Sequence, residues 1–397
     1  MERTKKPIVL LLILCMVMCF SLSACGSNGG STDPVTDQDS SQGEAVTDAP
    51  EIEGLTFESE LERDYATEFS VYRYEGGYKY LHTVDGDDYL LVPEGGTVPE
   101  GLDENVVIIQ APVENIYLAA TAMMSLFISM DGTDSIRMSS LKADGWMYDE
   151  PKKLMEEGKI IYAGKYSEPD YEMLIDEGCS LAIESTMIYH SPEVKEMIED
   201  LGIPVLVDMS SFESNPLGRM EWIKFFAELI GKEDEAKAFF DEQKVKVEEL
   251  NDFPNTEKTV AFFYISTDGK AVVRSADDYI PAMIDMAGAR YIFKDVSDEA
   301  GKSTIPMTIE AFYDIAADAD YIIYNTSIDS SVVTLNDLLA KDPIMSEMKA
   351  VKEGNCWASG GSMYQRTDIA GDVIMDFHTL FTEEDPESKL QFISKLE

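Results

Sequence analysis

Tyrosine, tryptophan, methionine and arginine side chains gather in polar segments that follow short apolar runs of this 397-residue chain. Aromatic rings offer rigid contact area, and arginine pairs with carboxylate or catecholate oxygens. Such a set suits a large ligand with apolar faces and anionic edges, although each residue could instead pack in the core or pair with a neighbouring acid. The candidate ligand-binding residues are Gln110, Trp146, Tyr189, His190, Arg219, Arg274, Met363, Tyr364 and Arg366.

The sequence gives little support for catalysis or for a resident metal. It contains no G-x-S-x-G, G-x-x-x-x-G-K-[ST] or H-E-x-x-H pattern, so we expect no catalytic residue. Its three histidines, His82, His190 and His378, fall in a hairpin, a loop and a C-terminal helix, which is too dispersed for a bare metal site. We therefore expect no metal site and no cofactor, and leave open His190 as a single axial ligand to haem or cobalt.

Short apolar runs and helical stretches alternate from about Val106 onward, which predicts parallel sheets in an α/β arrangement. Ligands in such folds bind beyond the carboxyl ends of the strands, where most of the candidate residues lie; Trp146 lies in a polar loop between Gly and Asp residues. Earlier, residues 67–93 alternate in polarity around Gly-Gly and Asp-Gly, which predicts β-hairpins. The predicted strands of the α/β part are 106–110, 160–164, 181–185, 204–211, 259–266, 271–275, 321–325 and 356–361.

The two halves of the chain repeat one plan. A short helix, a break and a buried strand in 171–185 recur in 312–325, and another helix and strand follow each. Between the halves, residues 232–253 contain no glycine or proline and predict a helix that joins two lobes. The predicted fold is two Rossmann-like lobes with mainly parallel sheets, residues 55–232 and 253–397, joined by a single helix at 233–252.

The N-terminus has the pattern of an export signal. Arg3, Lys5 and Lys6 precede an apolar run, and Leu22-Ser23-Ala24 then precedes Cys25. Leu-Ser-Ala-Cys resembles the lipobox of bacterial lipoproteins, which implies cleavage after residue 24 and lipidation of Cys25. Residues 25–54 are rich in Gly, Ser, Thr and Asp and predict a flexible tether. We expect a protein held on the outer face of the cell membrane by its lipid.

The chain is strongly acidic, with a formal charge of −45. Phosphate backbones would repel such a surface, so we expect no nucleic-acid partner. Of the five cysteines, Cys15 and Cys19 lie in the signal and Cys25 carries the lipid. Cys179 and Cys356 are too far apart in sequence for a disulfide framework, and we expect two buried, inert thiols.

Lipobox, tether, two α/β lobes and one joining helix together resemble the substrate-binding lipoproteins of ABC importers, in particular the class that binds iron–siderophores, haem or cobalamin. The stretches "AIESTMIYHSPEVKEMIEDLGIPVLV" and "AGARYIFKD" are similar to blocks of that class. The resemblance implies a monomer that captures a metal chelate in a groove between the lobes and delivers it to a permease. It also implies one docking carboxylate on each lobe, for which we select Glu172 and Asp277, with Asp278 as alternate.

Two other functions stay open at this point, a lipid-anchored hydrolase and a structural surface lipoprotein. A siderophore, haem and a corrinoid all fit the candidate residues; with the resemblance to this class, we expect an iron–siderophore first, with haem and a corrinoid as alternatives. Residues 55–100 are additional to the pattern of the class, and the sequence assigns them no role.

Overall fold

The computed structural model describes residues 48–84, 86–297 and 302–397. Residues 49–397 form one compact unit. The predicted signal, the lipidation site Cys25 and most of the predicted tether lie outside the described residues. The packed part of the chain starts before the expected Leu55, because Ile52 is buried and the hydroxyl of Tyr74 donates a hydrogen bond to the carbonyl of Pro50.

An N-terminal sheet precedes the two lobes. Its strands follow the order β1-β2-β3-β4-β5, antiparallel except for the parallel pair β4–β5, so the predicted hairpins are confirmed. One face of this sheet packs on the main core, and the other is covered by the segments around Ile52 and Leu102. The strands are β1 (Phe57–Glu60), β2 (Phe69–Tyr74), β3 (Tyr78–Thr83), β4 (Asp88–Val92) and β5 (Val107–Gln110).

The N-lobe has a parallel five-stranded sheet of order β12-β11-β6-β7-β8. The expectation that 106–110 opens this sheet is wrong, because that segment is β5 of the N-terminal sheet. Its place is taken by a three-residue strand, β6, that the apolar pattern did not single out. The strands are β6 (Ile116–Leu118), β7 (Ile136–Ser139), β8 (Ile161–Tyr162), β11 (Ala182–Ser185) and β12 (Val205–Asp208).

The C-lobe has a seven-stranded sheet whose centre is parallel and whose edges are antiparallel. Strands β13, β17 and β18 form the parallel centre, and β14, β16 and β19 pair antiparallel at the edges. The strands are β13 (Thr259–Ile265), β14 (Ala271–Arg274), β15 (Arg290–Tyr291), β16 (Thr304–Met307), β17 (Tyr321–Tyr324), β18 (Cys356–Ser359) and β19 (Ile393–Lys395). A two-residue pair, β9 (Gly164–Lys165) with β10 (Glu168–Pro169), forms a separate ribbon in the N-lobe.

Helices cover both lobe sheets in the repeated order that the sequence predicts. Helix α3 leads into β11 and α4 into β12, as α8 leads into β17 and α10 into β18. Outside the linking region the helices are α1 (Met124–Ser129), α2 (Asp149–Glu156), α3 (Tyr171–Asp176), α4 (Pro192–Asp200), α7 (Tyr279–Met286), α8 (Ile309–Ala316), α9 (Leu335–Lys341), α10 (Lys349–Glu353) and α11 (Ala370–Thr382).

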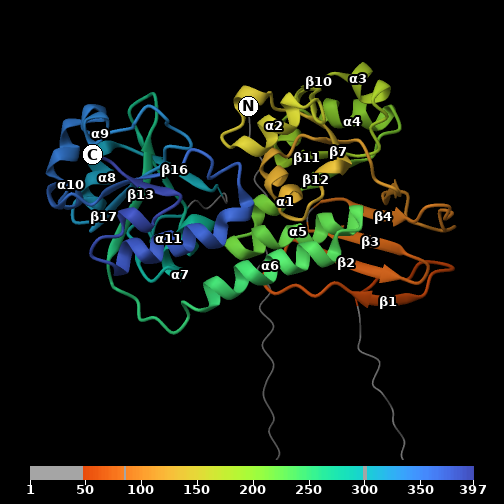
Figure 1. The fold of residues 1–397 in the computed structure, drawn as a ribbon, viewed down its shortest axis with the longest axis horizontal. Coiled ribbons are helices and arrows are strands. Elements are labelled where there is room, and N and C mark those ends of the chain that lie inside the picture. Colours follow the sequence, from red (N-terminus) through yellow and green to blue (C-terminus); the bar gives the residue numbers. More distant parts are fainter. Residues whose placement is uncertain (1–47, 85, 298–301) are drawn as a thin grey trace, which may run out of the picture. The chain divides into compact units, whose positions relative to one another are not determined.

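Two helices in succession carry the chain from the N-lobe to the C-lobe. Helix α5 (Pro216–Ile230) begins where the Asn215 side chain accepts hydrogen bonds from two backbone N–H groups, and ends at Gly231, which has a left-handed φ of 68°. Helix α6 (Glu233–Glu248) then leads to β13 and ends four residues earlier than the predicted linker. Figure 1 shows α5 and α6 side by side, with the N-terminal strands at one end and α11 of the C-lobe packed against them.

Candidate functional site

A narrow cavity lies between the lobes, beside the start of α5. Its volume is about 30 Å³, which leaves room for little more than water, and four of the predicted ligand-binding residues line it. Arg219 comes from α5, whereas Met363, Tyr364 and Arg366 come from the loop that follows β18, and Tyr279 comes from α7. The fold thus brings together residues that are more than 140 positions apart in the sequence. Arg274 adjoins them, since its guanidinium lies 5.8 Å from the ring centres of both Tyr279 and Tyr364.

The three arginines of this region differ in how their charges are compensated. Arg274 forms a bidentate pair with Asp278, and Arg366 forms one with Asp368. Arg219 forms no ion pair with the described residues. Its guanidinium donates a hydrogen bond of 3.3 Å to the carbonyl of Ser211 and stacks 4.2 Å from the ring centre of Tyr279. Arg219 is therefore the cation of the cavity that is free to bind an anionic group.

The cavity tyrosines are neutral phenols. Burial raises the pKa of both Tyr279 and Tyr364 above the ordinary value, although Arg219 and Arg274 oppose the shift in each. The hydroxyl of Tyr364 accepts a hydrogen bond of 2.9 Å from the side-chain amide of Asn325. These rings offer apolar faces and hydroxyl groups to a ligand.

A larger hollow lies at the carboxyl ends of the N-lobe strands. It measures about 540 Å³ and opens to solvent, and its lining includes Lys142, Asp144, Tyr162, Lys165, Tyr166 and Met187. The ammonium group of Lys142 lies 5.1 Å from the ring centre of Tyr162. Neither lysine forms an ion pair with the part of the chain that the structure describes. Sequence reasoning missed these lysines and tyrosines, although the rule that ligands bind beyond strand ends applies to β7 and β8 as well.

Direct contacts between the lobes separate the cavity from the hollow. The side-chain oxygen of Gln365 accepts a hydrogen bond of 2.8 Å from the backbone N–H of Met147, and its NH₂ group donates one of 3.0 Å to the carbonyl of Gly145. Gly145 lines the hollow, whereas the neighbours of Gln365 on both sides line the cavity. The backbone N–H of Asp368 also donates to the hydroxyl of Ser125 across the lobes.

The other predicted ligand-binding residues lie outside the cavity. Tyr189 and His190 are exposed on the short helix after β11. Trp146 is buried and packs edge to face on Tyr148, which places it in the wall of the N-lobe. Gln110 ends β5 in the N-terminal sheet, where its amide donates to backbone carbonyls of that sheet, and it joins neither the cavity nor the hollow.

The predicted docking carboxylates lie on separate lobes. Glu172 is exposed in the first turn of α3, and Asp277 is exposed just before α7. The carboxylate of the alternate, Asp278, already has partners within the protein: it pairs with Arg274 and accepts a hydrogen bond from the backbone N–H of Ile280 at the start of α7.

The described residues contain no cluster of three or more histidine, cysteine or acidic side chains that could hold a metal ion. His82 pairs with Asp88, and Nδ1 of His378 lies 3.1 Å from the carbonyl oxygen of Ala287, so the histidines do not converge. In the same described residues, no helix has the length and apolar character needed to cross a membrane.

Several known proteins share this fold. The chain is 28% identical over 328 residues to an uncharacterized lipoprotein of Methanocaldococcus jannaschii, covering 77% of this chain and 75% of the relative. Solved structures with the same fold include the periplasmic haem-binding protein HutB of Vibrio cholerae, with a TM-score of 0.55 at 17% identity over 68% of this chain and 99% of that one. A periplasmic haem-binding protein of Pseudomonas aeruginosa has a TM-score of 0.56 at 14% identity, covering 72% of this chain and 98% of its own.

The same fold occurs in a ferric-hydroxamate transport protein of Saccharomonospora viridis, with a TM-score of 0.53 at 16% identity over 68% of this chain and 94% of that one. These likenesses establish the two-lobed architecture. The family assignment rests on a sequence model described as periplasmic binding protein, which matches residues 138–358, more than half of the chain. The chain therefore belongs to the periplasmic binding protein family and is a substrate-binding protein, not an enzyme.

Proposed function

We propose that this protein captures an anionic metal chelate outside the cell and delivers it to the permease of an ABC importer. The observation that carries the proposal is the charge of the groove. By the groove we mean the cavity and the hollow together. In a chain of formal charge −45, it is lined by Arg219, Lys142 and Lys165, which form no ion pair with the described residues, and by one carboxylate, that of Asp144. A ligand with anionic edges would supply the missing partners.

The aromatic and thioether groups of the groove define the other part of the ligand. Tyr162 and Tyr166 in the hollow offer apolar faces to a flat or globular body, and Tyr279, Tyr364 and Met363 in the cavity would join them once the Gln365 contacts between the lobes open. An iron–siderophore combines such a body with anionic oxygens. Haem, which proteins of this fold in Vibrio cholerae and Pseudomonas aeruginosa bind, and a corrinoid are the alternatives.

Delivery requires the protein to stay near the membrane, and we propose that lipid on Cys25 provides this attachment. The relatives in Methanocaldococcus jannaschii are lipoproteins, which supports the attachment. The docking partners would be arginines of the permease, which pair with Glu172 on one lobe and Asp277 on the other. We propose that the protein acts as a monomer.

The first test is an absorption spectrum of the full chain purified from its own host, followed by titration with a ferric tris-catecholate, a ferric trihydroxamate and haemin. We expect one of the three to bind and to quench tryptophan fluorescence. Absence of any bound chromophore together with no binding of all three probes would overturn the proposal, as would rapid hydrolysis of ester substrates.

Substitution of Arg219 tests which cation holds the ligand. We expect Arg219→Gln to weaken the binding of the chelate about tenfold, because one charge-assisted pair of roughly 1.4 kcal/mol is lost. The matched control is Arg290→Gln, since Arg290 is half exposed and pairs with Glu257 on the surface of the C-lobe. Equal affinities in the wild type and in the Arg219 variant would show that the cavity does not bind the anionic part of the ligand.

A further inference from the structure

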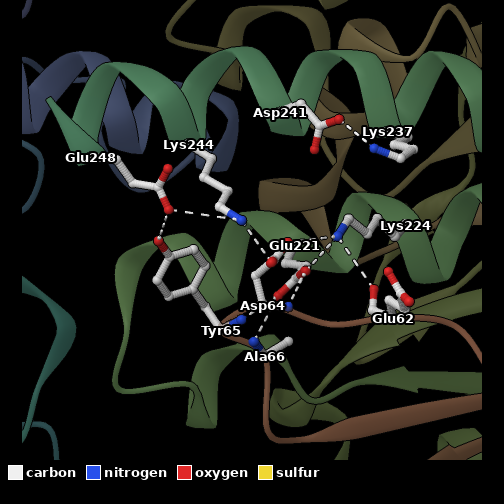
Figure 2. A network of polar contacts seen from close by, with 10 residues as sticks. All are labelled: Glu62, Asp64, Tyr65, Ala66, Glu221, Lys224, Lys237, Asp241, Lys244 and Glu248. Carbon is white, nitrogen blue, oxygen red and sulfur yellow. Dashed lines mark hydrogen bonds and ion pairs between the residues drawn. The ribbon is translucent and has the colours of Figure 1, made fainter.

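The N-terminal sheet has no role in the proposed function, yet it makes the most extensive polar contacts with the linking helices. The match to the family model begins only at residue 138, beyond the last strand of this sheet. Between β1 and β2, the segment Leu61–Glu68 runs along α5 and α6, and Figure 2 shows its contacts with both helices. We call this segment the brace.

Buried glutamates of the N-lobe hold the brace in place. The carboxylate of Glu221, on α5, is fully buried and accepts hydrogen bonds of 2.7–2.8 Å from the backbone N–H groups of Asp64, Tyr65 and Ala66. It also accepts one of 2.6 Å from the ammonium group of Lys224. A carboxylate that accepts four hydrogen bonds uses its full capacity, so its burial is compensated only while the brace is present.

A second buried glutamate extends this attachment. The carboxylate of Glu213, just before α5, accepts the backbone N–H groups of Thr67 and Glu68 and the indole N–H of Trp222. Together, Glu213 and Glu221 receive five consecutive backbone N–H groups, from Asp64 to Glu68. The brace is therefore part of the N-lobe as firmly as a paired strand would be.

The brace also contacts α6, the helix that leads to the C-lobe. The carboxylate of Asp64 lies 2.7 Å from the ammonium group of Lys244, and the hydroxyl of Tyr65 donates a hydrogen bond of 3.2 Å to Glu248. The ring of Tyr65 packs edge to face on Phe240 at 6.4 Å. Lys244 and Glu248 are one turn apart and thus face the brace together.

The same part of α6 is tied to the C-lobe. The side-chain amide of Gln243 donates to the carboxylate of Asp372 on α11, and the ammonium group of Lys246 lies 3.2 Å from that carboxylate. The space above Gly371 is filled by Gln243, since a Cβ atom there would lie 2.5 Å from its side-chain oxygen. One stretch of α6, residues 243–248, is therefore held by the N-lobe through the brace and by the C-lobe through α11.

From these contacts we infer that the brace limits the opening of the groove by fixing the linking helix α6 to the N-lobe. A lone helix between two lobes would otherwise bend or pivot where α5 ends and α6 begins. With the brace in place, movement of the C-lobe and α6 away from the N-lobe must break the Asp64–Lys244 and Tyr65–Glu248 contacts. The N-terminal sheet thus acts as a support that sets how far the lobes separate.

The test removes the polar contacts of the brace with α6 and leaves the buried contacts with α5 intact. In the double variant Tyr65→Phe/Lys244→Met, the aromatic packing on Phe240 and the apolar stem of residue 244 are kept, so the fold is retained. The readout is hydrogen exchange, by mass spectrometry, of peptides that contain the backbone N–H groups of Met147 and Asp368, because both donate across the lobes. In ligand-free full-length protein we expect their protection to fall about fivefold.

Lys237→Met is the matched control, since Lys237 also lies on α6 and, within residues 48–84, 86–297 and 302–397, its one ion pair is with Asp241 of the same helix. Peptides of β11 and β17 report on the stability of each lobe. The inference would be overturned if the protection of the Met147 and Asp368 peptides were unchanged in the double variant, or if it fell as much in the Lys237→Met control. It would also be overturned if the peptides of β11 and β17 lost as much protection as the peptides between the lobes. Because no ligand is present, the result does not depend on which chelate the protein binds.

Discussion

Buried carboxylates in this protein differ sharply in what surrounds them. Glu221 is fully satisfied by hydrogen bonds, whereas neither side-chain oxygen of Glu184, which is fully buried on β11, has a partner among the described residues. Burial raises the pKa of Glu184 from 4.5 to about 8. Glu184 is therefore a neutral acid at pH 7, and its titration affects the stability of the N-lobe.

This pKa predicts a stability that decreases as the pH rises. Between about pH 4.5 and 8 the folded state keeps a proton on Glu184 that the unfolded state releases, so the free energy of unfolding falls across this window. Glu184→Gln removes the titration and keeps the shape. At pH 8 we expect the variant to be more stable than the wild type by on the order of 3 kcal/mol, and about equally stable at pH 4.5, as measured by urea unfolding.

Exposed Glu196 on α4 provides the control, because Glu196→Gln should leave the pH dependence unchanged. Carboxylates with lowered pKa values, such as Asp329 at about 2, lose their contribution at low pH in the wild type and in both variants alike. A stability difference between Glu184→Gln and the wild type that is the same at both pH values would contradict the prediction.

At the scale of elements, α5 connects the N-terminal sheet to the rest of the molecule by buried charge. The carboxylate of Glu228, almost fully buried on α5, forms ion pairs with Arg73 of β2 and Lys79 of β3. Both cations lie on neighbouring strands, so one carboxylate fixes the register of the sheet on the helix. Removal of this carboxylate would leave Arg73 without an ion-pair partner among the described residues, and Lys79 with Glu233 alone.

Glu228→Gln should therefore destabilise the protein by roughly 3 kcal/mol. The measurement is the midpoint of urea unfolding at unchanged slope. Glu235→Gln is the comparison, because Glu235 forms an exposed ion pair with Lys232, and its loss should leave the midpoint where it is in the wild type. Equal midpoints for the two variants would mean that the sheet and the helix are held together by apolar packing alone.

At the scale of the whole molecule, the proposed docking carboxylates Glu172 and Asp277 are exposed on separate lobes. We expect Glu172→Arg/Asp277→Arg to leave the affinity for the chelate unchanged and to abolish uptake, because arginine on both sides of the interface repels. The measurements are chelate titration of the purified protein and uptake of a radiolabelled iron chelate by cells. Glu196→Arg, which reverses an exposed charge on a neighbouring helix, should leave uptake intact. Loss of uptake in that control would show that uptake depends on the overall surface charge and not on the two docking carboxylates.

Several features of the fold could be predicted from the local sequence. Long apolar runs such as 259–266 and 321–325 form strands, and the repeated order of helix, break and strand appears in both lobes. Gly231, followed by a stretch without glycine or proline, marks the boundary between α5 and α6. These signals are local, because capping, apolar runs and periodicity depend on residues close together in the chain.

The pairing of strands could not be predicted in the same way. The run at 106–110 has the composition of a central parallel strand, yet it pairs with β4, which lies 15 residues earlier and whose hairpin was already predicted. The true first strand of the N-lobe sheet, β6, has three residues and no distinctive pattern. The position of a strand in a sheet depends on tertiary contacts, and these form only in the folded molecule.

By itself the sequence determined the two α/β lobes, the linking helix, the acidic surface and a set of arginine, tyrosine and methionine residues near strand ends. Tertiary structure alone decided which of them share a cavity: Arg219, Met363, Tyr364 and Arg366 meet there, while Trp146 is buried in a wall and Gln110 lies in another sheet. It also decided which cations stay free, because an arginine or lysine is compensated only by the carboxylates that folding brings within a few ångströms.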